Sequence, residues 1–176
     1  MNRMLVLVVV SLIVAVPALG SDDGDGENRG WCSLDGGWYG ASAFGPWAWT
    51  ATMTSSQNAV GTVAWTGGNG TWFGYCPDSV RNSIGQGVAT RIGPRSFETT
   101  FVTFSIAADG SIACIWKVTG WVELDRGCDA GVLNGEIQLY NADQDPFSGE
   151  PFVCFPEGPN QLFVRMTVDP THPICP

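Results

Sequence analysis

The feature that most constrains the fold is an alternation of period two along the chain. Between Trp47 and Thr54, large apolar side chains and threonines take turns, so that Trp47, Trp49 and Met53 share one face of an extended segment. A β-strand places successive side chains on opposite faces, and this pattern therefore predicts a strand with one buried face. No segment has the apolar spacing of a helix, so the sequence predicts an all-β chain.

The same alternation recurs along the chain and is interrupted by turn residues. Asp109-Gly110 between two such runs is a strong hairpin signal. About eight strands are predicted, near residues 37–43, 46–54, 60–66, 85–92, 96–107, 111–125, 131–141 and 161–168. Most links are short, which favours an antiparallel up-and-down barrel. The longer stretches 67–84 and 142–160 would suit the crossovers of a two-sheet β-sandwich, which stays open as the alternative.

The beginning of the chain has the pattern of a secretory signal peptide. Arg3 precedes an apolar run, and Ala18-Leu19-Gly20 ends the run with small residues, which predicts a signal peptide over 1–20. The run is shorter than the about 20 apolar residues that span a bilayer. Residues 21–30 are acidic and predict a disordered leader. Residues 31–176 are predicted to form a single β-barrel domain of a secreted protein, extracellular or periplasmic.

The charge of the chain excludes several kinds of partner. The sequence has 8 Lys and Arg residues against 17 Asp and Glu, a net charge of −9. A protein that binds nucleic acid needs a basic surface to contact phosphates, so we expect no nucleic-acid partner. For the same reason we expect no attraction to anionic membranes, and no membrane insertion once the signal peptide has been cleaved.

Six cysteines follow the predicted signal peptide, and an even number in an exported chain predicts three disulfides. Their spacing lacks the close pairs of a zinc site. Two of them, Cys32 and Cys175, flank the domain, and our first pairing hypothesis joins them and leaves the other four to pair among themselves. The six are Cys32, Cys76, Cys114, Cys128, Cys154 and Cys175.

The first predicted strand opens with Cys32-Ser33-Leu34-Asp35-Gly36-Gly37-Trp38-Tyr39, which contains the pattern G-x-W. This segment resembles the first-strand signature of lipocalin-like (calycin-type) barrels and the opening of avidin-like barrels. In those families the Trp plugs one end of the barrel and an Arg near the last strand packs on it. The resemblance, over about eight residues, implies these roles for Trp38 and Arg165. The rest of the chain, especially the segment 141–147, resembles uncharacterised secreted bacterial proteins.

Eight tryptophans point to a binding function or to a large aromatic core. In a barrel, the inward apolar residues either fill the interior or line a cavity for a small apolar or amphipathic ligand. The residues predicted to do so are Trp47, Trp49, Met53, Trp65 and Trp116. We therefore interpret the chain as a secreted binding protein. One alternative is a carbohydrate-binding or surface interaction module that uses exposed tryptophans such as Trp72, and another is a structural domain without a ligand.

We expect no enzymatic activity and no cofactor. His172 is the only histidine and lies near the end of the chain, where no held imidazole is expected. Lys117 is expected to be an outward, solvated lysine. The carboxylates of Glu123, Asp125 and Glu136 occupy outward strand positions, which makes a catalytic pair a weak interpretation.

The segment after residue 140 carries a weak calcium-loop pattern. Asn141, Asp143 and Asp145 alternate as oxygen ligands do, but Pro146 stands where the loop needs Gly and Phe152 where it needs Glu. We interpret the segment as a polar turn and predict no metal site.

Overall fold

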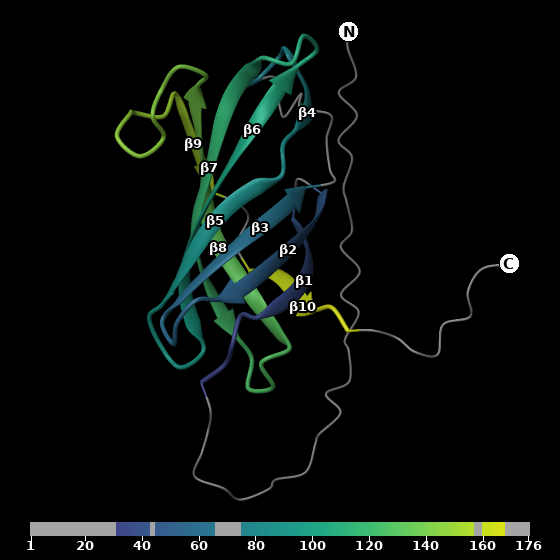
Figure 1. The fold of residues 1–176 in the computed structure, drawn as a ribbon, viewed down its shortest axis with the longest axis vertical. Helices are drawn as coiled ribbons and strands as arrows, with labels where there is room; N and C mark the ends of the chain where they lie inside the picture. Colours follow the sequence, from purple (N-terminus) through teal and green to yellow (C-terminus); the bar gives the residue numbers. More distant parts are fainter. Residues whose placement is uncertain (1–30, 43–44, 66–74, 157–159, 168–176) are drawn as a thin grey trace, which may run out of the picture.

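The computed structural model describes residues 31–42, 45–65, 75–156 and 160–167. Within these ranges the chain forms ten β-strands and no helix (Figure 1). The strands are β1 (Gly36–Ser42), β2 (Gly45–Met53), β3 (Asn58–Trp65), β4 (Ser79–Asn82), β5 (Gly85–Arg91), β6 (Ser96–Ala107), β7 (Ile112–Leu124), β8 (Ala130–Asn141), β9 (Val153–Pro156) and β10 (Gln161–Arg165). The predicted all-β class is confirmed.

Eight of these strands close an antiparallel barrel. The order around the ring is β10-β1-β2-β3-β5-β6-β7-β8, and β10 pairs both with β1 and with the first part of β8. The predicted hairpin at Asp109-Gly110 joins β6 to β7, and Gly110, with a φ of 89°, donates its N–H to the Ala107 carbonyl at 3.0 Å. Because the ring is closed, the barrel interpretation is confirmed and the two-sheet sandwich is excluded.

The strands β4 and β9 lie in the stretches that sequence analysis treated as connections. β4 pairs with the last residues of β6, and β9 pairs with Glu136–Leu139 of β8. The long strands β6, β7 and β8 have 12, 13 and 12 residues, whereas β1 has 7 and β10 has 5. The long strands therefore extend beyond the ring, where their backbone groups need other partners. β4 and β9 supply those partners at what we call the upper end (Figure 1).

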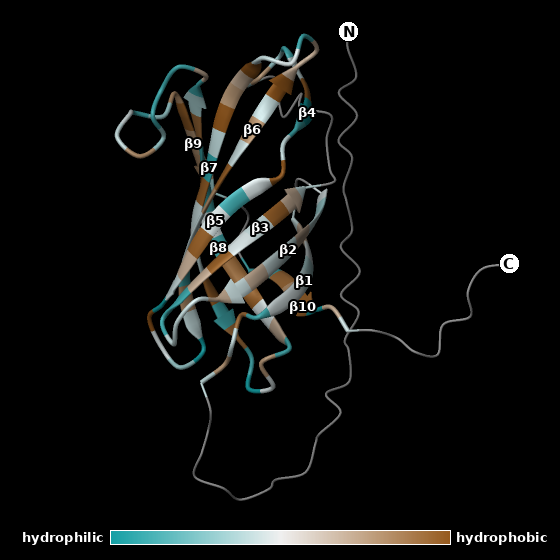
Figure 2. Ribbon diagram, viewed as in Figure 1, coloured by the Kyte–Doolittle hydropathy of each residue, from teal (hydrophilic) through white to brown (hydrophobic). Residues whose placement is uncertain are grey.

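The barrel interior is built from aromatic side chains that lie over glycines. A Cβ atom on Gly40 would overlap the indole of Trp47, and one on Gly61 would overlap the indole of Trp49. Each bare backbone therefore makes room for a large ring opposite it, which gives the dense packing of a protein core. Figure 2 shows the resulting alternation of hydrophobic and polar residues along β6 and β7.

The opposite end of the barrel, which we call the base, is crossed by residues 31–35. The indole of Trp38 is fully buried there and donates to the Leu34 carbonyl at 2.8 Å. The guanidinium of Arg165 lies 4.2 Å from the centre of the Trp38 ring. Arg165 also donates to the carbonyls of Ser33 and Cys128, each at 2.9 Å. The structure thus places Trp38 and Arg165 against each other at one end of the barrel.

The disulfides correct the pairing hypothesis. Cys32 is bonded to Cys128, not to Cys175, because residues 31–35 cross the base next to the turn between β7 and β8. Cys76 is bonded to Cys114. Cys154 is exposed and has no disulfide partner among the described residues, whereas Cys175 lies outside them. The third disulfide stays a prediction.

The structure bears on location in two respects. Its two disulfides are typical of extracellular or periplasmic proteins. The described part of the chain contains no helix of the length and apolarity needed to cross a membrane. The predicted signal peptide and the acidic leader lie outside the described residues.

Candidate functional site

The residues predicted to bind a ligand inside the barrel belong to its core. Trp47, Trp49 and Trp116 are buried, and Met53 and Trp65 are partly buried and pack against the same cluster. Trp47, Trp49 and Trp65 border one internal space, and Trp65 and Trp116 border a second one above it. Met53 borders neither of these two spaces. The structure therefore brings four of the five residues together around the barrel axis.

These internal spaces are small, about 20 and about 10 Å³. A single water molecule needs about 10–15 Å³, and pockets for small molecules have about 300–1,000 Å³. In the described structure the side chains themselves fill the interior. The sequence could not distinguish a filled barrel from a hollow one, because both need apolar inward faces.

The indole N–H groups inside the barrel differ in their partners. Trp47 Nε1 donates to Gln161 Oε1 at 3.2 Å, and Trp116 Nε1 donates to Ser105 Oγ at 2.6 Å. Trp49 Nε1 is buried and meets no acceptor among the described residues. Its ring instead contacts Phe101 edge to face, with ring centres 5.2 Å apart. Burying an unpaired donor costs free energy, so this position is a weak point of the core.

A larger site lies on the outer surface of β7, β8 and β9. We call it the outer groove, and its volume is about 550 Å³. Its floor is bare backbone where Gly120 of β7 faces Gly135 of β8. The residues that line the outer groove are Thr119, Gly120, Trp121, Asn134, Gly135, Glu136, Cys154, Phe155 and Pro156.

Three side chains give the outer groove its chemistry. Trp121 is 48% exposed and is paired in register with Asn134 on the neighbouring strand. Asn134 Oδ1 accepts a hydrogen bond from the Asn160 N–H at 2.8 Å, whereas its Nδ2 is covered by protein and has no acceptor in the described structure. Glu136 follows on the same face of β8 and is exposed. The outer groove thus offers a ligand an aromatic surface and a carboxylate, whereas the amide of Asn134 is covered.

A chain of hydrogen bonds orients Glu136. Burial raises the pKa of the Tyr140 phenol, and Cys154 and Glu136 nearby add to this shift, so the phenol keeps its proton. Tyr140 donates that proton to Gln138 Oε1 at 2.7 Å, and Gln138 Nε2 donates in turn to Glu136. The carboxylate is therefore held in place as a hydrogen-bond acceptor.

The sequence alone did not single out Trp121 among the eight tryptophans, and it suggested Glu136 only as part of a carboxylate pair. Of that proposed set, Glu123 forms an ion pair with Arg95 at 3.3 Å, and Asp125 accepts from the backbone of its own turn. The available signal was the alternation along β7, in which Trp121 is exposed between the buried Val118 and the buried Val122. Periodicity marks such a position as outward but cannot say which side chains gather around it.

Two other sequence interpretations have a clear outcome. Lys117 is not a free, solvated lysine, because Nζ donates to the Pro146 carbonyl at 3.0 Å and lies 5.6 Å from the Phe147 ring. Asp145 accepts from the Phe147 N–H and the Ser148 hydroxyl, and these bonds lower its pKa. Across the described ranges, no three His, Cys, Asp or Glu side chains gather as a metal site would need. Trp72 and His172 lie outside those ranges.

Comparison with known proteins adds no assignment: the chain matches no protein-family model, and no curated protein matches its sequence.

Proposed function

We propose that the protein is an exported binding protein that holds a neutral carbohydrate chain in the outer groove. The observation that carries the proposal is the exposed indole of Trp121 beside the oriented Glu136 carboxylate. A sugar ring has one face of C–H groups and a rim of hydroxyls. An aromatic surface beside a hydrogen-bond acceptor can contact both.

The volumes favour the outer groove over the barrel interior. At about 550 Å³ the outer groove is large enough for a small molecule or a few sugar units, whereas the interior spaces reach about 20 Å³. A ligand inside the barrel would have to displace Trp47 or Trp49 from the glycines beneath them. A ligand inside the barrel is the second candidate, and the observation that favours it is the unpaired Trp49 N–H.

The charges favour a neutral sugar. Glu136 lies in the outer groove itself, and the chain carries a net charge of −9. An anionic sugar would approach a carboxylate through the negative field of the whole molecule, which costs free energy. A neutral sugar hydroxyl can donate to the same carboxylate.

The test is titration calorimetry of the protein with cellohexaose, mannohexaose and chitohexaose, together with retardation in gels that contain the corresponding soluble polysaccharides. We expect one of these to bind, and we expect Trp121→Ala to weaken that binding at least about tenfold, because a buried aromatic contact is worth about 1.5–3 kcal/mol. The matched control is Trp31→Ala, which removes another exposed tryptophan, at the base. No retention of any of the three glycans, or equal binding by Trp121→Ala, would contradict the proposal.

A second variant tests the carboxylate. Glu136→Gln keeps the shape of the side chain but replaces the charged acceptor by a neutral amide. We expect the affinity to fall about 2- to 10-fold, the value of one hydrogen bond, with little change in thermal stability because Glu136 is exposed. Native mass spectrometry tests the second candidate: a mass that organic solvent removes, and that Trp49→Glu abolishes, would place the ligand inside the barrel instead.

A further inference from the structure

A second depression lies on the outer surface of the barrel, over β2, β3, β5 and β6. We call it the hollow, and its volume of about 690 Å³ is within the range of small-molecule pockets. Bare backbone at Gly61 and Gly87 lines the hollow, as Gly120 and Gly135 line the outer groove. The outer groove begins on β7, which is the neighbour of β6 in the barrel, so the two sites are adjacent.

The two sites meet at one pair of threonines. Thr100 of β6 borders the hollow, Thr119 of β7 borders the outer groove, and these two residues are partners in register. The same row of partners continues to Glu136 in the outer groove and to Val88 in the hollow. Neighbouring strands are about 4.8 Å apart, so the row covers about 14 Å between Glu136 and Val88. An extended ligand that crosses the strands can therefore contact both sites.

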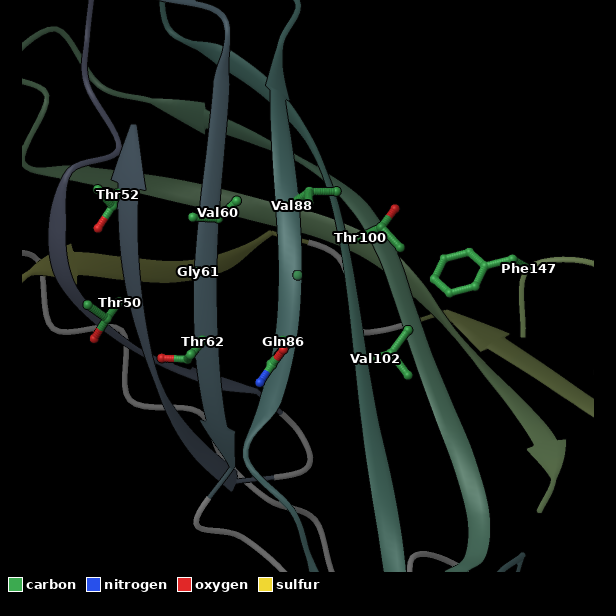
Figure 3. A pocket seen from close by; sticks show the side chains of 11 residues that line it. Thr50, Thr52, Val60, Gly61, Thr62, Gln86, Val88, Thr100, Val102 and Phe147 are labelled. Atoms are coloured by element: carbon green, nitrogen blue, oxygen red, sulfur yellow. The ribbon is translucent and has the colours of Figure 1, made fainter. Parts of the chain in front are cut away.

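Two aromatic rings flank this pair of threonines. Trp121 lies two positions after Thr119 on β7, toward the base, and is 48% exposed. Phe147, from the connection between β8 and β9, is 70% exposed and points toward Thr100 and Val102 of β6 (Figure 3). A ligand that passes from the outer groove to the hollow therefore passes between an indole and a phenyl ring.

The protein holds Phe147 in place although its ring is exposed. Lys117 lies two positions before Thr119 on β7, toward the upper end, and donates from Nζ to the Pro146 carbonyl at 3.0 Å. The same Nζ is 5.6 Å from the centre of the Phe147 ring. The Phe147 N–H donates to Asp145 Oδ1 at 2.9 Å. A ring that is already held in place costs less conformational entropy to order when a ligand binds.

The hollow combines apolar and hydrogen-bonding groups without a charge. Val60 and Val88 are about half exposed in it, and threonines and Gln86 stand around them on the same strands (Figure 3). None of the described residues that line the hollow is charged. Valine methyl groups and the Phe147 ring can contact the C–H face of a sugar, and hydroxyl and amide groups can both donate to and accept from its hydroxyls. The hollow therefore suits a neutral ligand of the kind proposed for the outer groove.

We propose that the hollow is a second subsite for the carbohydrate chain held in the outer groove, and that the ligand is a polysaccharide that crosses β7 and β6 between Trp121 and Phe147. This inference rests on the proposed function, because it extends the site of that function. Continuity with the outer groove, a second positioned ring and the absence of charge in the lining select this occupant. Once one part of a chain is bound, contact of the next part is intramolecular and adds affinity. A short sugar occupies the outer groove alone, so affinity depends on chain length.

The test is titration calorimetry with cellobiose and cellohexaose, and with the corresponding pairs of mannose and N-acetylglucosamine chains. In the series that binds, we expect the hexasaccharide to bind at least about tenfold more tightly than the disaccharide. Phe147→Ala should weaken binding of the hexasaccharide about 2- to 10-fold and leave the disaccharide unchanged, whereas Trp121→Ala should weaken both. The matched control is Phe152→Ala, which removes another exposed ring of the same connection that borders neither site.

Hydroxyl-radical footprinting of the unmodified protein tests the same contact without a variant. The bound hexasaccharide should protect both Trp121 and Phe147 from oxidation, and the bound disaccharide should protect Trp121 alone. A hexasaccharide that protects Trp121 but not Phe147, or that binds equally to Phe147→Ala, overturns the second subsite and leaves the outer groove as a site for short sugars. If none of the sugars binds, the proposed function fails and the second subsite fails with it.

Discussion

The base and the upper end of the barrel are stabilised in different ways. At the base, residues 31–35 cross beneath the ring and are fixed by the Cys32–Cys128 disulfide and by Arg91 and Arg165. At the upper end, β6, β7 and β8 continue beyond the ring, and the outer two of them, β6 and β8, pair with the short strands β4 and β9. The base therefore depends on a few side chains, and the upper end on many backbone hydrogen bonds.

The difference shows how sequence distance affects stability. The base joins residues separated by 96 positions in the disulfide and by 132 in the contact from Arg165 to Ser33. The upper disulfide, Cys76–Cys114, joins residues only 38 positions apart. A disulfide that closes a longer loop removes more freedom from the unfolded chain, so the Cys32–Cys128 bridge should contribute more to stability than the Cys76–Cys114 bridge.

The largest expected effect is the loss of the base disulfide. Loop-closure entropy predicts that replacing Cys32 and Cys128 by Ser lowers the free energy of unfolding by about 4.7 kcal/mol, against about 3.9 kcal/mol for Cys76 and Cys114. Urea unfolding of both double variants measures the difference. A larger loss from the upper pair would show that local strand pairing, not loop length, governs the stability of this barrel.

The protein purified without a reductant tests the prediction that all six cysteines form disulfides. Two disulfides account for four cysteines, and the predicted third bridge would join Cys154 to Cys175. Alkylation without reduction, followed by peptide mapping, should find no free thiol in the exported protein. A labelled Cys154 would show that the prediction of three disulfides is wrong.

The next effect concerns Arg165. Arg165→Met keeps the aliphatic stem but removes three hydrogen bonds to backbone carbonyls and the cation over Trp38. Hydrogen bonds from charged donors contribute about 1.5–3 kcal/mol each but are not additive, so we expect a loss of about 3 kcal/mol. Arg81→Met on the exposed strand β4 should change stability by no more than about 0.5 kcal/mol. Similar losses from both variants would remove the distinction between the two ends.

The sequence predicted the ring but not its extensions. Alternating runs such as 47–54 carry a clear period of two, and all eight predicted strands appear in the barrel. The strands β4 and β9 have four residues each, too few to show a period, and they form because long neighbours offer unpaired backbone. Short edge strands of this kind depend on tertiary context.

The candidate site was predictable only in part. The alternation correctly placed Trp47 and Trp49 inside, but only the packing over Gly40 and Gly61 shows that they fill the space. The outer groove depends on the register that sets Trp121 against Asn134, which no local pattern reveals. The pairing of Cys32 was missed because residues 31–35 cross the base, a path determined by contacts with distant residues such as Arg165.

The smallest predicted effect is a pH dependence of the stability that comes from Asp35 at the base of the barrel. Hydrogen bonds from the Met53 N–H and the Ser33 hydroxyl lower the pKa of Asp35, and Arg165 adds to this shift. Because the pKa is lower in the folded state, the ionised Asp35 stabilises the fold at every pH above its pKa in the unfolded chain, which is near 3.9. This stabilisation is lost as the pH falls through the pKa of the folded state. Asp35→Asn should therefore lower the melting temperature at pH 6 and have progressively less effect toward pH 2.5.

Asp109 supplies the matched comparison at the upper end. Its pKa is also lowered, but by the hydroxyl and N–H of Ser111 within its own turn. Because this turn involves only neighbouring residues, it can also form in the unfolded chain. The pKa of Asp109 should therefore differ less between the folded and the unfolded state than the pKa of Asp35 does. Asp109→Asn should consequently shift the melting temperature less than Asp35→Asn at every pH. An equal shift, or one for Asp35→Asn that does not change with pH, would show that the carboxylate of Asp35 does not help to hold the base closed.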